Sequence, residues 1–228
     1  MYLDWSYIVL VLPAVIFAMV ASARVNSVFN KYASRRCRSG ITGAQAARRI
    51  LDANGLHYVA IGKVSGELTD HFNPTDNTVY LSDSTHSAAS VAAIGVAAHE
   101  AGHAVQHAKG YFPMKIRAAI IPATNFGSKL AMPLLILGII LSYPTLAFAG
   151  VILFSLSTLF QLVTLPVEFN ASRRAIAALD EGARLGGEEM SAARKVLRAA
   201  ALTYVGALAM SLLNLLRLIL IANRSRRN

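Results

Sequence analysis

The stretch IRAAIIPATNFGSKLAMPLLILGIILSYPTLAFAGVILFSLSTLFQLVTL, residues 116–165, is almost wholly apolar and decides the class of fold. A Tyr-Pro pair at residues 143–144 divides it, because proline does not continue an ordinary helix. The division predicts two apolar helices, over about residues 117–142 and 145–165. A helix needs about 20 apolar residues to cross a bilayer core. The stretch therefore predicts a transmembrane hairpin over residues 116–165.

Two further apolar segments lie near the ends of the chain, at residues 1–22 and 199–228. The first carries Trp5 near its start, where an aromatic ring suits the membrane–water interface. Asp4 is the only charge before its apolar run, whereas a cleaved signal peptide begins with basic residues, so we expect an uncleaved anchor. The last segment predicts a membrane helix followed by a basic tail. These segments and the hairpin predict a mainly α, multi-pass protein of the cell membrane, with about four transmembrane helices in the lipid bilayer.

The composition agrees with a membrane protein. Hydrophobic residues make up 55% of the chain and charged residues 15%, whereas a soluble domain carries about a quarter charged residues. The formal net charge is +10, but no basic stripe interleaved with aromatic residues and no nucleic-acid motif is present, so we expect no nucleic-acid partner. The single cysteine, Cys37, excludes an intrachain disulfide.

Two polar segments, residues 23–115 and 166–198, separate the apolar ones. The first is predicted to contain a helix over residues 41–55, in which Thr42 and Gln45 have the spacing of a capping box. Strand-like runs then precede a second helix over about residues 90–110, and a Pro-, Asp- and Asn-rich turn between the last two runs predicts a hairpin. The strand-like runs are residues 57–64, 67–72 and 77–82.

The string HEAGH lies within the second predicted helix of this segment. His99 and His103 are four residues apart, so a helix places both imidazoles on one face, and Glu100 lies between them. In this H-E-x-x-H pattern the histidines bind zinc and the glutamate acts as general base. Zinc lowers the pKa of a bound water to about 7, and a nearby carboxylate accepts its proton as the water attacks a carbonyl. The pattern also occurs by chance on solvated helices, but the small apolar flanks here favour one zinc ion per chain.

A third protein ligand is expected, because catalytic zinc sites typically keep three. A pattern with a third histidine on the same helix requires Gly and His where this chain has Gln106 and Lys109. Glu168 is the preferred ligand, since a carboxylate so close to apolar chain is costly unless it is paired or bound to metal. The alternative pairs Glu168 with a neighbouring arginine at the membrane edge, which would leave His71 or His107 as the third ligand.

Three strings resemble the YugP-like family of neutral zinc membrane metallopeptidases: VAAHEAGHAVQ, LPVEFNASRRA and DHFNPTDNTVYLS. Their arrangement is similar to the gluzincins, including membrane proteases of the heat-shock and CAAX-processing type. The resemblance covers about residues 40–210 and implies a zincin-like α+β catalytic segment, with a small sheet beside the zinc helix. It also implies His99, His103 and Glu168 as metal ligands and Glu100 as the base.

The chain departs from the pattern of its relatives after the third ligand. Related proteases carry an aspartate four residues later, where this chain has Ser172, and the family block leads us to expect an aspartate where it has Asn170. The residues that orient the ligands therefore stay open, with Asn170, Ser172 and Asp180 as candidates.

Similar enzymes pair an extended substrate with an edge strand near the zinc helix, through backbone hydrogen bonds. The run chosen for this role could equally be an ordinary strand of the sheet. It comprises Asn77, Thr78, Val79, Tyr80, Leu81 and Ser82. An oxyanion stabiliser is also required, and His71 and Tyr204 are the candidates.

The positions of lysine and arginine predict the orientation. Residues 23–118 contain 11 of them and residues 166–198 contain 6, whereas the turn at residues 143–144 contains none. The positive-inside rule then places the catalytic segments in the cytoplasm. The basic tail disagrees, because four complete spans would place its arginines outside. Either the last apolar segment does not fully cross the membrane, or a basic tail is tolerated on the outside.

These observations predict a membrane-embedded, zinc-dependent endopeptidase that acts on protein or peptide substrates, of an oligomeric state that the sequence does not specify. The alternative is a non-enzymatic membrane scaffold or regulatory protein stabilised by zinc. Glu100 argues against the scaffold, since a structural site needs no base. A transporter is a weaker hypothesis, because the chain lacks paired broken helices in matching halves.

Overall fold

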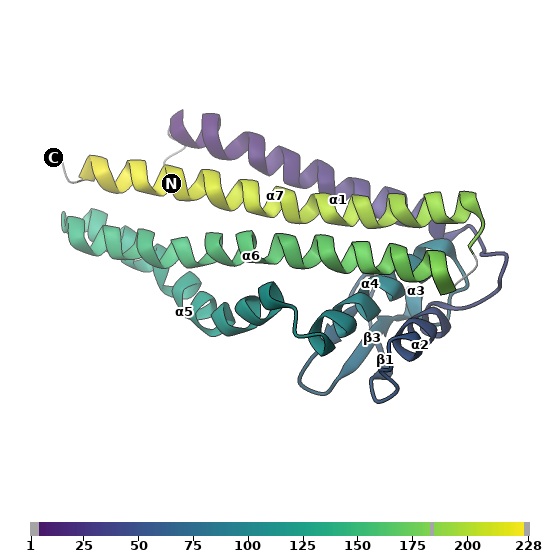
Figure 1. Cartoon of the computed structure of the whole chain (residues 1–228). Helices are drawn as coiled ribbons and strands as arrows, with labels where there is room; N and C mark the ends of the chain where they lie inside the picture. The colour runs from purple at the N-terminus through teal and green to yellow at the C-terminus, as the bar shows by residue number, and fades with distance from the viewer. Residues whose placement is uncertain (1–4, 183–184, 226–228) are drawn as a thin grey trace. The chain divides into compact units, whose positions relative to one another are not determined.

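The computed structural model describes residues 5–182 and 185–225 and is mainly helical (Figure 1). A π-helical turn, Tyr7–Val11, leads into the first helix. The helices are α1 (Leu12–Ala33), α2 (Gly43–Ala53), α3 (Asp83–His86), α4 (Val91–Ala108), α5 (Phe112–Ile140), α6 (Pro144–Gly182) and α7 (Gly187–Ser225). The strands are β1 (Ala60–Val64), β2 (His71–Asn73) and β3 (Thr78–Ser82).

The chain forms two compact units. The first, here called the helical unit, comprises Met1–Ala21, Pro113–Pro166 and Thr203–Asn228. The second, here called the mixed unit, comprises Ser22–Phe112 and Val167–Leu202 and contains the sheet. Helices α1, α6 and α7 each contribute residues to both units.

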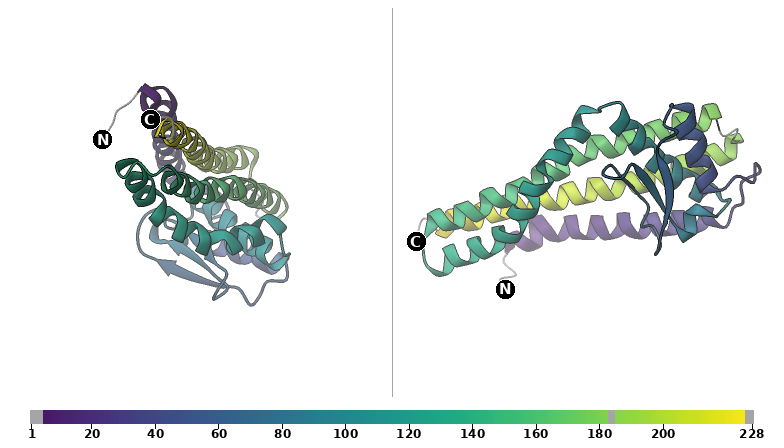
Figure 2. Two further views of the ribbon diagram at one scale, coloured as in Figure 1. Left: turned by 90° about the vertical axis from the view of Figure 1, so that its left-hand side faces the viewer. Right: turned by 90° about the horizontal axis from the view of Figure 1, so that it is seen from below.

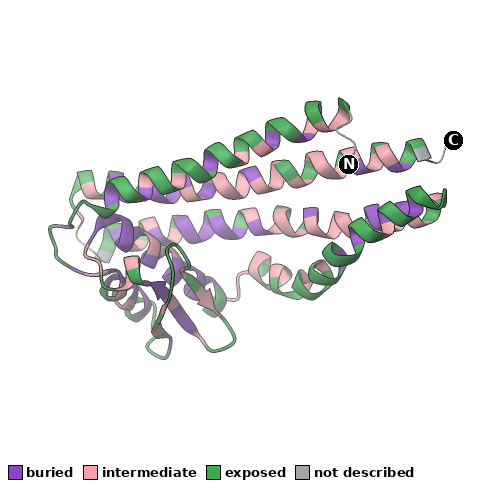
Figure 3. Cartoon of the chain, turned by 180° about the vertical axis from the view of Figure 1, so that it is seen from behind, coloured by how far each residue is buried: buried purple, intermediate pink, exposed green. Residues whose placement is uncertain are grey.

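Four helices of the described chain are long and apolar enough to cross a membrane, which agrees with the predicted number. They extend over Tyr7–Ala33, Phe112–Ile140, Pro144–Glu181 and Gly187–Arg224. Large apolar side chains such as Phe17, Ile140 and Ile152 are exposed along them, and Figure 3 shows the exposed positions in green. Because apolar side chains on the outside of a helix bundle suit lipid, these helices indicate an integral membrane protein.

Close backbone approaches hold α5 against α6 in the helical unit. A Cβ at Gly150 would lie 2.6 Å from the carbonyl oxygen of Ala131, so only glycine permits this approach. Helix α6 also contacts α7 through a hydrogen bond of 2.8 Å between the hydroxyls of Thr158 and Ser211. The helices of this unit therefore pack as membrane helices do, through small residues and polar pairs.

Helices α5 and α6 are separated at the Tyr-Pro pair 143–144, as predicted, and α6 extends beyond the predicted apolar span to Gly182. The continuation follows from helical spacing, since every fourth residue after Pro166 is apolar and fully buried in the mixed unit. These residues are Val167, Ala171, Ala175 and Leu179. The segment predicted to carry the third ligand is thus part of a rigid helix.

The mixed unit contains a three-stranded sheet with the order β1-β3-β2 (Figure 2). Strand β2 pairs antiparallel with β3, as the predicted hairpin requires, and β1 pairs parallel with β3 on its other side. Strand β3 is therefore central, and the prediction of an edge strand over residues 77–82 is wrong in this respect. The residues concerned are Asn77, Thr78, Val79, Tyr80, Leu81 and Ser82, and Asn77 lies just before the strand.

Helix α4 forms the centre of the mixed unit and packs against α2, β2 and β3. Helix α2 begins with the predicted capping box, in which Thr42 accepts a hydrogen bond from the backbone of Gln45 and the Gln45 side chain accepts one from the backbone of Thr42. The core that surrounds α4 includes residues of α1, α2, β3, α6 and α7. The sheet and four helices therefore fix the position of α4.

Candidate metal centre

Helix α4 places the two histidines of HEAGH side by side. The Ser90 side chain caps the helix by accepting a hydrogen bond of 3.2 Å from the backbone N–H of Ala93. His99 and His103 then lie one turn apart, with their ring centroids 4.7 Å apart and the rings nearly perpendicular. Both imidazoles are largely shielded from solvent, with side chains 12% and 9% exposed.

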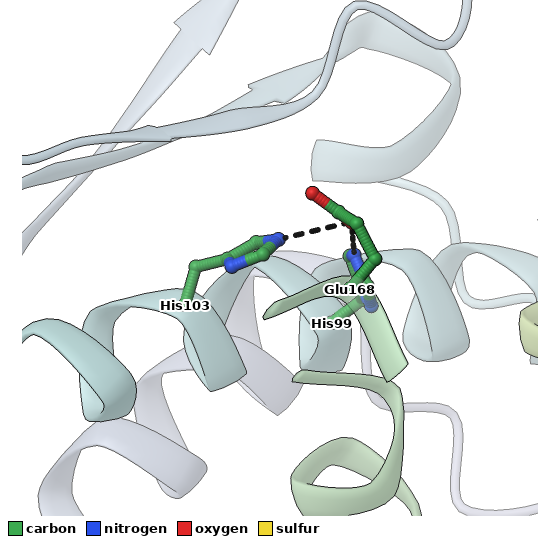
Figure 4. A group of neighbouring side chains, drawn as sticks. All are labelled: His99, His103 and Glu168. Atoms are coloured by element: carbon green, nitrogen blue, oxygen red, sulfur yellow. Dashed lines mark hydrogen bonds and ion pairs between the residues drawn. The ribbon is translucent and has the colours of Figure 1, made fainter. Parts of the chain in front are cut away.

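Glu168 on α6 completes the group (Figure 4). Its Oε2 lies 3.1 Å from Nε2 of His99 and 3.4 Å from Nε2 of His103. Glu168 is 2% exposed, and because a buried carboxylate is costly unless it is paired, the two imidazoles or a cation beside it favour its burial. Arg174, one of the two arginines that the sequence offered as its partner, donates from Nε to Oδ1 of Asn170.

The three ligand atoms have the spacing that a zinc ion requires. They all lie within 4.8 Å of one another. In a tetrahedral site with zinc–ligand bonds of about 2.0–2.1 Å, neighbouring ligand atoms are about 3.3 Å apart. The two measured separations from Glu168 Oε2 are close to this value. Two histidines and one glutamate are also a known ligand set of catalytic zinc sites, which leave the fourth position for water. The residues therefore fit zinc.

Glu168 reaches the histidines because α4 and α6 approach closely at Gly102. A Cβ at this position would lie 2.8 Å from the backbone carbonyl oxygen of Ala171, a distance that real Cβ atoms do not adopt. Gly95, two turns earlier on α4, has more room, and a Cβ there would meet Ala193 at 3.9 Å. The small residues around HEAGH thus allow the helices to bring the ligands together.

We expect Gly102→Ala to lower both zinc affinity and thermal stability, because the added Cβ pushes α6 and its Glu168 away from α4. Alanine in a helix interior is otherwise favoured over glycine by about 1 kcal/mol. Gly95→Ala is the matched control and should be neutral or stabilising. Thermal unfolding and zinc per chain after dialysis measure both effects. Equal behaviour of the two variants would contradict the importance of the approach at Gly102.

Each histidine contacts a second side chain through its other ring nitrogen. The Ser172 hydroxyl lies 3.2 Å from Nδ1 of His99, and Oε1 of Gln106 lies 2.9 Å from Nδ1 of His103. When both oxygens accept from Nδ1–H, each Nε2 carries a lone pair that is directed at the ion. Ser172 thus lies where an orienting residue is needed, at one of the positions proposed from the sequence.

The orientation of Gln106 is itself fixed by α6. Gln106 is fully buried, and its Nε2 donates to the carbonyl of Val167 at 2.8 Å and to Oδ1 of Asn170 at 2.9 Å. Arg174 Nε also donates to Oδ1 of Asn170, at 2.8 Å. Because the amide nitrogen must face these two acceptors, the amide oxygen faces His103. This role of Gln106 was not predicted, although its spacing of three residues from His103 puts both on one helix face.

Replacing Gln106 with leucine should weaken zinc binding about 10–100-fold, the usual effect of losing a group that orients a ligand. Asn170→Asp is the control, because a carboxylate can still accept from Gln106 and Arg174, and its affinity should stay near that of the wild type. Competition with a chromophoric chelator measures the zinc affinity of both variants. Unchanged affinity in Gln106→Leu would show that His103 needs no such support.

Glu100 lies beside the ligands without joining them. It is 8% exposed, and burial raises the pKa of its carboxyl, while the nearby imidazoles of His99 and His103 lower it. The negative charges of Glu168 and of Asp70, which precedes β2, also raise the pKa of this carboxyl. Glu100 therefore lies near the two histidines, Glu168 and Asp70.

The other histidines proposed from the sequence as ligands are not part of this group. The alternative ligands His71 and His107 are exposed, and among the described residues only His99, His103 and Glu168 form a metal-binding group. The His71 ring stacks on Tyr80 at 5.2 Å. Tyr204 lies on α7 in the helical unit.

Asp180 is the candidate orienting residue that the structure contradicts. It is exposed and lies 12 residues after Glu168 on α6, which is about 18 Å along a helix. A carboxylate at this distance cannot contact His99 or His103, and Ser172 and Gln106 occupy the relevant positions.

Comparisons with known proteins identify the family of the chain. The sequence profile of the family described as "Putative neutral zinc metallopeptidase" matches residues 7–223. The chain is also 45% identical to a protein of Bacillus subtilis (strain 168) named "Putative membrane protease YugP", over 215 residues that cover 94% of this chain and 96% of that protein. No solved structure matches the chain. The profile and the relative confirm the family resemblance inferred from the three sequence strings.

Proposed function

The chain belongs to this family of neutral zinc metallopeptidases, and from that premise we propose that it is a membrane-embedded endopeptidase. The observation that carries the proposal is the convergence of His99 Nε2, His103 Nε2 and Glu168 Oε2, at separations suited to one zinc ion. His99, His103 and Glu168 are proposed as the ligands and Glu100 as the general base.

The chain's own residues divide the chemistry between them. Zinc bound in such a site acidifies a water molecule and polarises the peptide carbonyl. Glu100 accepts a proton from the water while the water oxygen forms a bond to the carbonyl carbon. Glu100 then donates that proton to the nitrogen of the leaving amine as the C–N bond breaks. Ser172 and Gln106 keep the imidazoles oriented throughout. Glu100 ends each cycle as a carboxylate.

Strand β2 is the proposed docking edge for an extended substrate. Since β3 is paired on both sides, the free edges of the sheet belong to β1 and β2, and β2 is the one that packs against α4. Pairing through backbone groups tolerates many side chains. The endopeptidase is accordingly proposed to accept unfolded proteins of varied sequence.

The zinc-stabilised scaffold is the second candidate, and Glu100 counts against it. A buried carboxylate costs stability, and burial raises the pKa of this one. A scaffold has no use for it, whereas a peptidase requires a base beside the ligands.

The test is cleavage of an unfolded soluble protein by the full-length protein, purified and returned to lipid vesicles. We expect internal cleavage products, identified by mass spectrometry, that are lost when zinc is removed with a chelator and regained when zinc is restored. A protein that binds one zinc ion per chain and yields no products from several unfolded substrates would support the scaffold instead.

A further inference from the structure

We propose that the mixed unit contains a second site, which binds the phosphate group of an anionic phospholipid. The site is a cavity of about 470 Å³ between the C-terminal end of α1 and the N-terminal end of α7. A volume of this order falls within the range of small-ligand pockets. The cavity includes none of the metal ligands, so it does not depend on the proposed peptidase function.

Three cations line this cavity. Lys31 and Arg35 come from the end of α1 and the residues after it, and Lys195 comes from α7. Glu188 is the one carboxylate among the lining residues. Within the described parts of the chain, none of the three cations forms an ion pair with a carboxylate. The excess positive charge favours an anion with more than one oxygen.

An aromatic ring positions two of these cations. Tyr32 is 6% exposed, and both Lys31 Nζ and the Arg35 guanidinium carbon lie 5.7 Å from its ring centroid. Cation–π contacts at this distance hold a positive charge without neutralising it. The buried ring therefore keeps both cations beside the cavity and leaves their charge for a ligand.

The first turn of α7 adds further donors. Gly187 begins this helix and lines the cavity together with the hydroxyl-bearing Ser191. Backbone N–H groups at a helix N-terminus favour an anion. Glu189 does not compete for the cations, because its carboxylate accepts from the backbone N–H groups of Arg38 at 2.7 Å and Gly186 at 2.9 Å.

The sequence positions of the cations point to a lipid head group as the source of the phosphate. Lys195 lies four residues before the apolar stretch 199–222, about 6 Å along a helix, and Lys31 lies nine residues after the apolar stretch 7–22, about 14 Å. Both helices belong to the candidate membrane spans. A cation about 6 Å beyond an apolar span, as Lys195 is, lies at the level of lipid head groups, and basic pockets between membrane helices bind such groups.

The test uses the full-length protein in a neutral detergent and follows its thermal unfolding. Short-chain phosphatidylglycerol is titrated as the probe, with short-chain phosphatidylcholine and inorganic phosphate as separate arms. We expect only phosphatidylglycerol to raise the unfolding temperature, and to do so saturably. No response of the wild type, or the same shift with phosphatidylcholine or inorganic phosphate, would overturn the proposal.

Two triple variants with the same change of charge locate the site. Lys31→Gln, Arg35→Gln and Lys195→Gln together should lower the apparent affinity for phosphatidylglycerol on the order of 100-fold, since each cation near the surface contributes about fivefold. The control combines Lys63→Gln, Lys109→Gln and Arg194→Gln, which are exposed cations outside the cavity. Its affinity should stay within about threefold of the wild type.

Each shift is measured against the variant's own unfolding temperature, so a loss of basal stability does not mimic a loss of binding. The single variant Lys195→Gln gives a second readout, with an expected loss of about fivefold. Equal loss in the two triple variants would show that phosphatidylglycerol responds only to net charge and would overturn the cavity as its site.

Discussion

Replacing Glu100 with glutamine is expected to abolish peptide hydrolysis while leaving one zinc ion per chain. The amide has nearly the shape of the carboxylate, so it fits the buried position, but it cannot accept a proton from water. General bases contribute about 10²–10⁴-fold to such reactions. The three converging ligand atoms belong to His99, His103 and Glu168, so zinc content should not depend on Glu100.

The measurement combines the rate of product formation from an unfolded protein with zinc per chain after dialysis. Glu67→Gln is the matched control, because the same chemical change then falls on an exposed residue of the mixed unit. That variant should hydrolyse at the wild-type rate. If Glu100→Gln hydrolysed the substrate at the wild-type rate, Glu100 would not be the general base and another residue would have to serve as it.

Removing the Glu168 carboxylate should have the largest effect on metal binding. Its Oε2 lies within 3.4 Å of both imidazole Nε2 atoms, so Glu168→Ala leaves only two ligands on α4. Zinc affinity depends on ligand number and geometry. We expect an affinity loss of more than about 100-fold, beyond the 10–100-fold typical of groups that only orient ligands, and a matching loss of activity.

Zinc per chain after dialysis tests this prediction, with His103→Ala as the positive comparison and Glu181→Ala as the control. Glu181 is an exposed carboxylate on the same helix, α6, and its removal should leave zinc in place. Full zinc occupancy in Glu168→Ala would return Glu168 to the role of a paired membrane-edge carboxylate. The third ligand would then have to be sought at His71 or His107.

The sequence predicted most of what depends on local patterns. Apolar length predicted the four candidate membrane helices, the spacing of Thr42 and Gln45 predicted the capped start of α2, and the turn between β2 and β3 predicted their hairpin. The helical repeat placed His99 and His103 on one face. In each case the residues that decide the structure lie close together in the sequence.

The sequence predicted less where distant segments meet. Strand β3 is central because β1, which ends fourteen residues before β3 begins, pairs with it in parallel. The sequence of residues 77–82 does not indicate that this strand pairs on both sides. Helix α6 continues past the predicted apolar span of about residues 145–165, because apolar residues recur at helical spacing beyond Pro166 and are buried in the mixed unit. Non-local pairing and packing override local signals in both places.

Apart from Ser172, the residues that support the ligands could not be predicted from the sequence. In the sequence, Gln106 stands out only because a pattern with a third histidine would have glycine there. Its role in orienting His103 depends on Val167 and Asn170 of another helix. Gly102 occupies a position that the motif leaves free, and its importance follows from the carbonyl of Ala171 across the helix contact. Both roles exist only once α4 and α6 are packed together.

The most direct test of the central claim is a zinc titration of the metal-free, full-length protein, with hydrolysis of an unfolded protein followed at each step. One zinc ion held by His99, His103 and Glu168, with Glu100 as base, predicts that the rate rises in proportion to bound zinc and stops rising at one ion per chain. Hydrolysis that is independent of zinc, or its absence at full occupancy, would contradict the account.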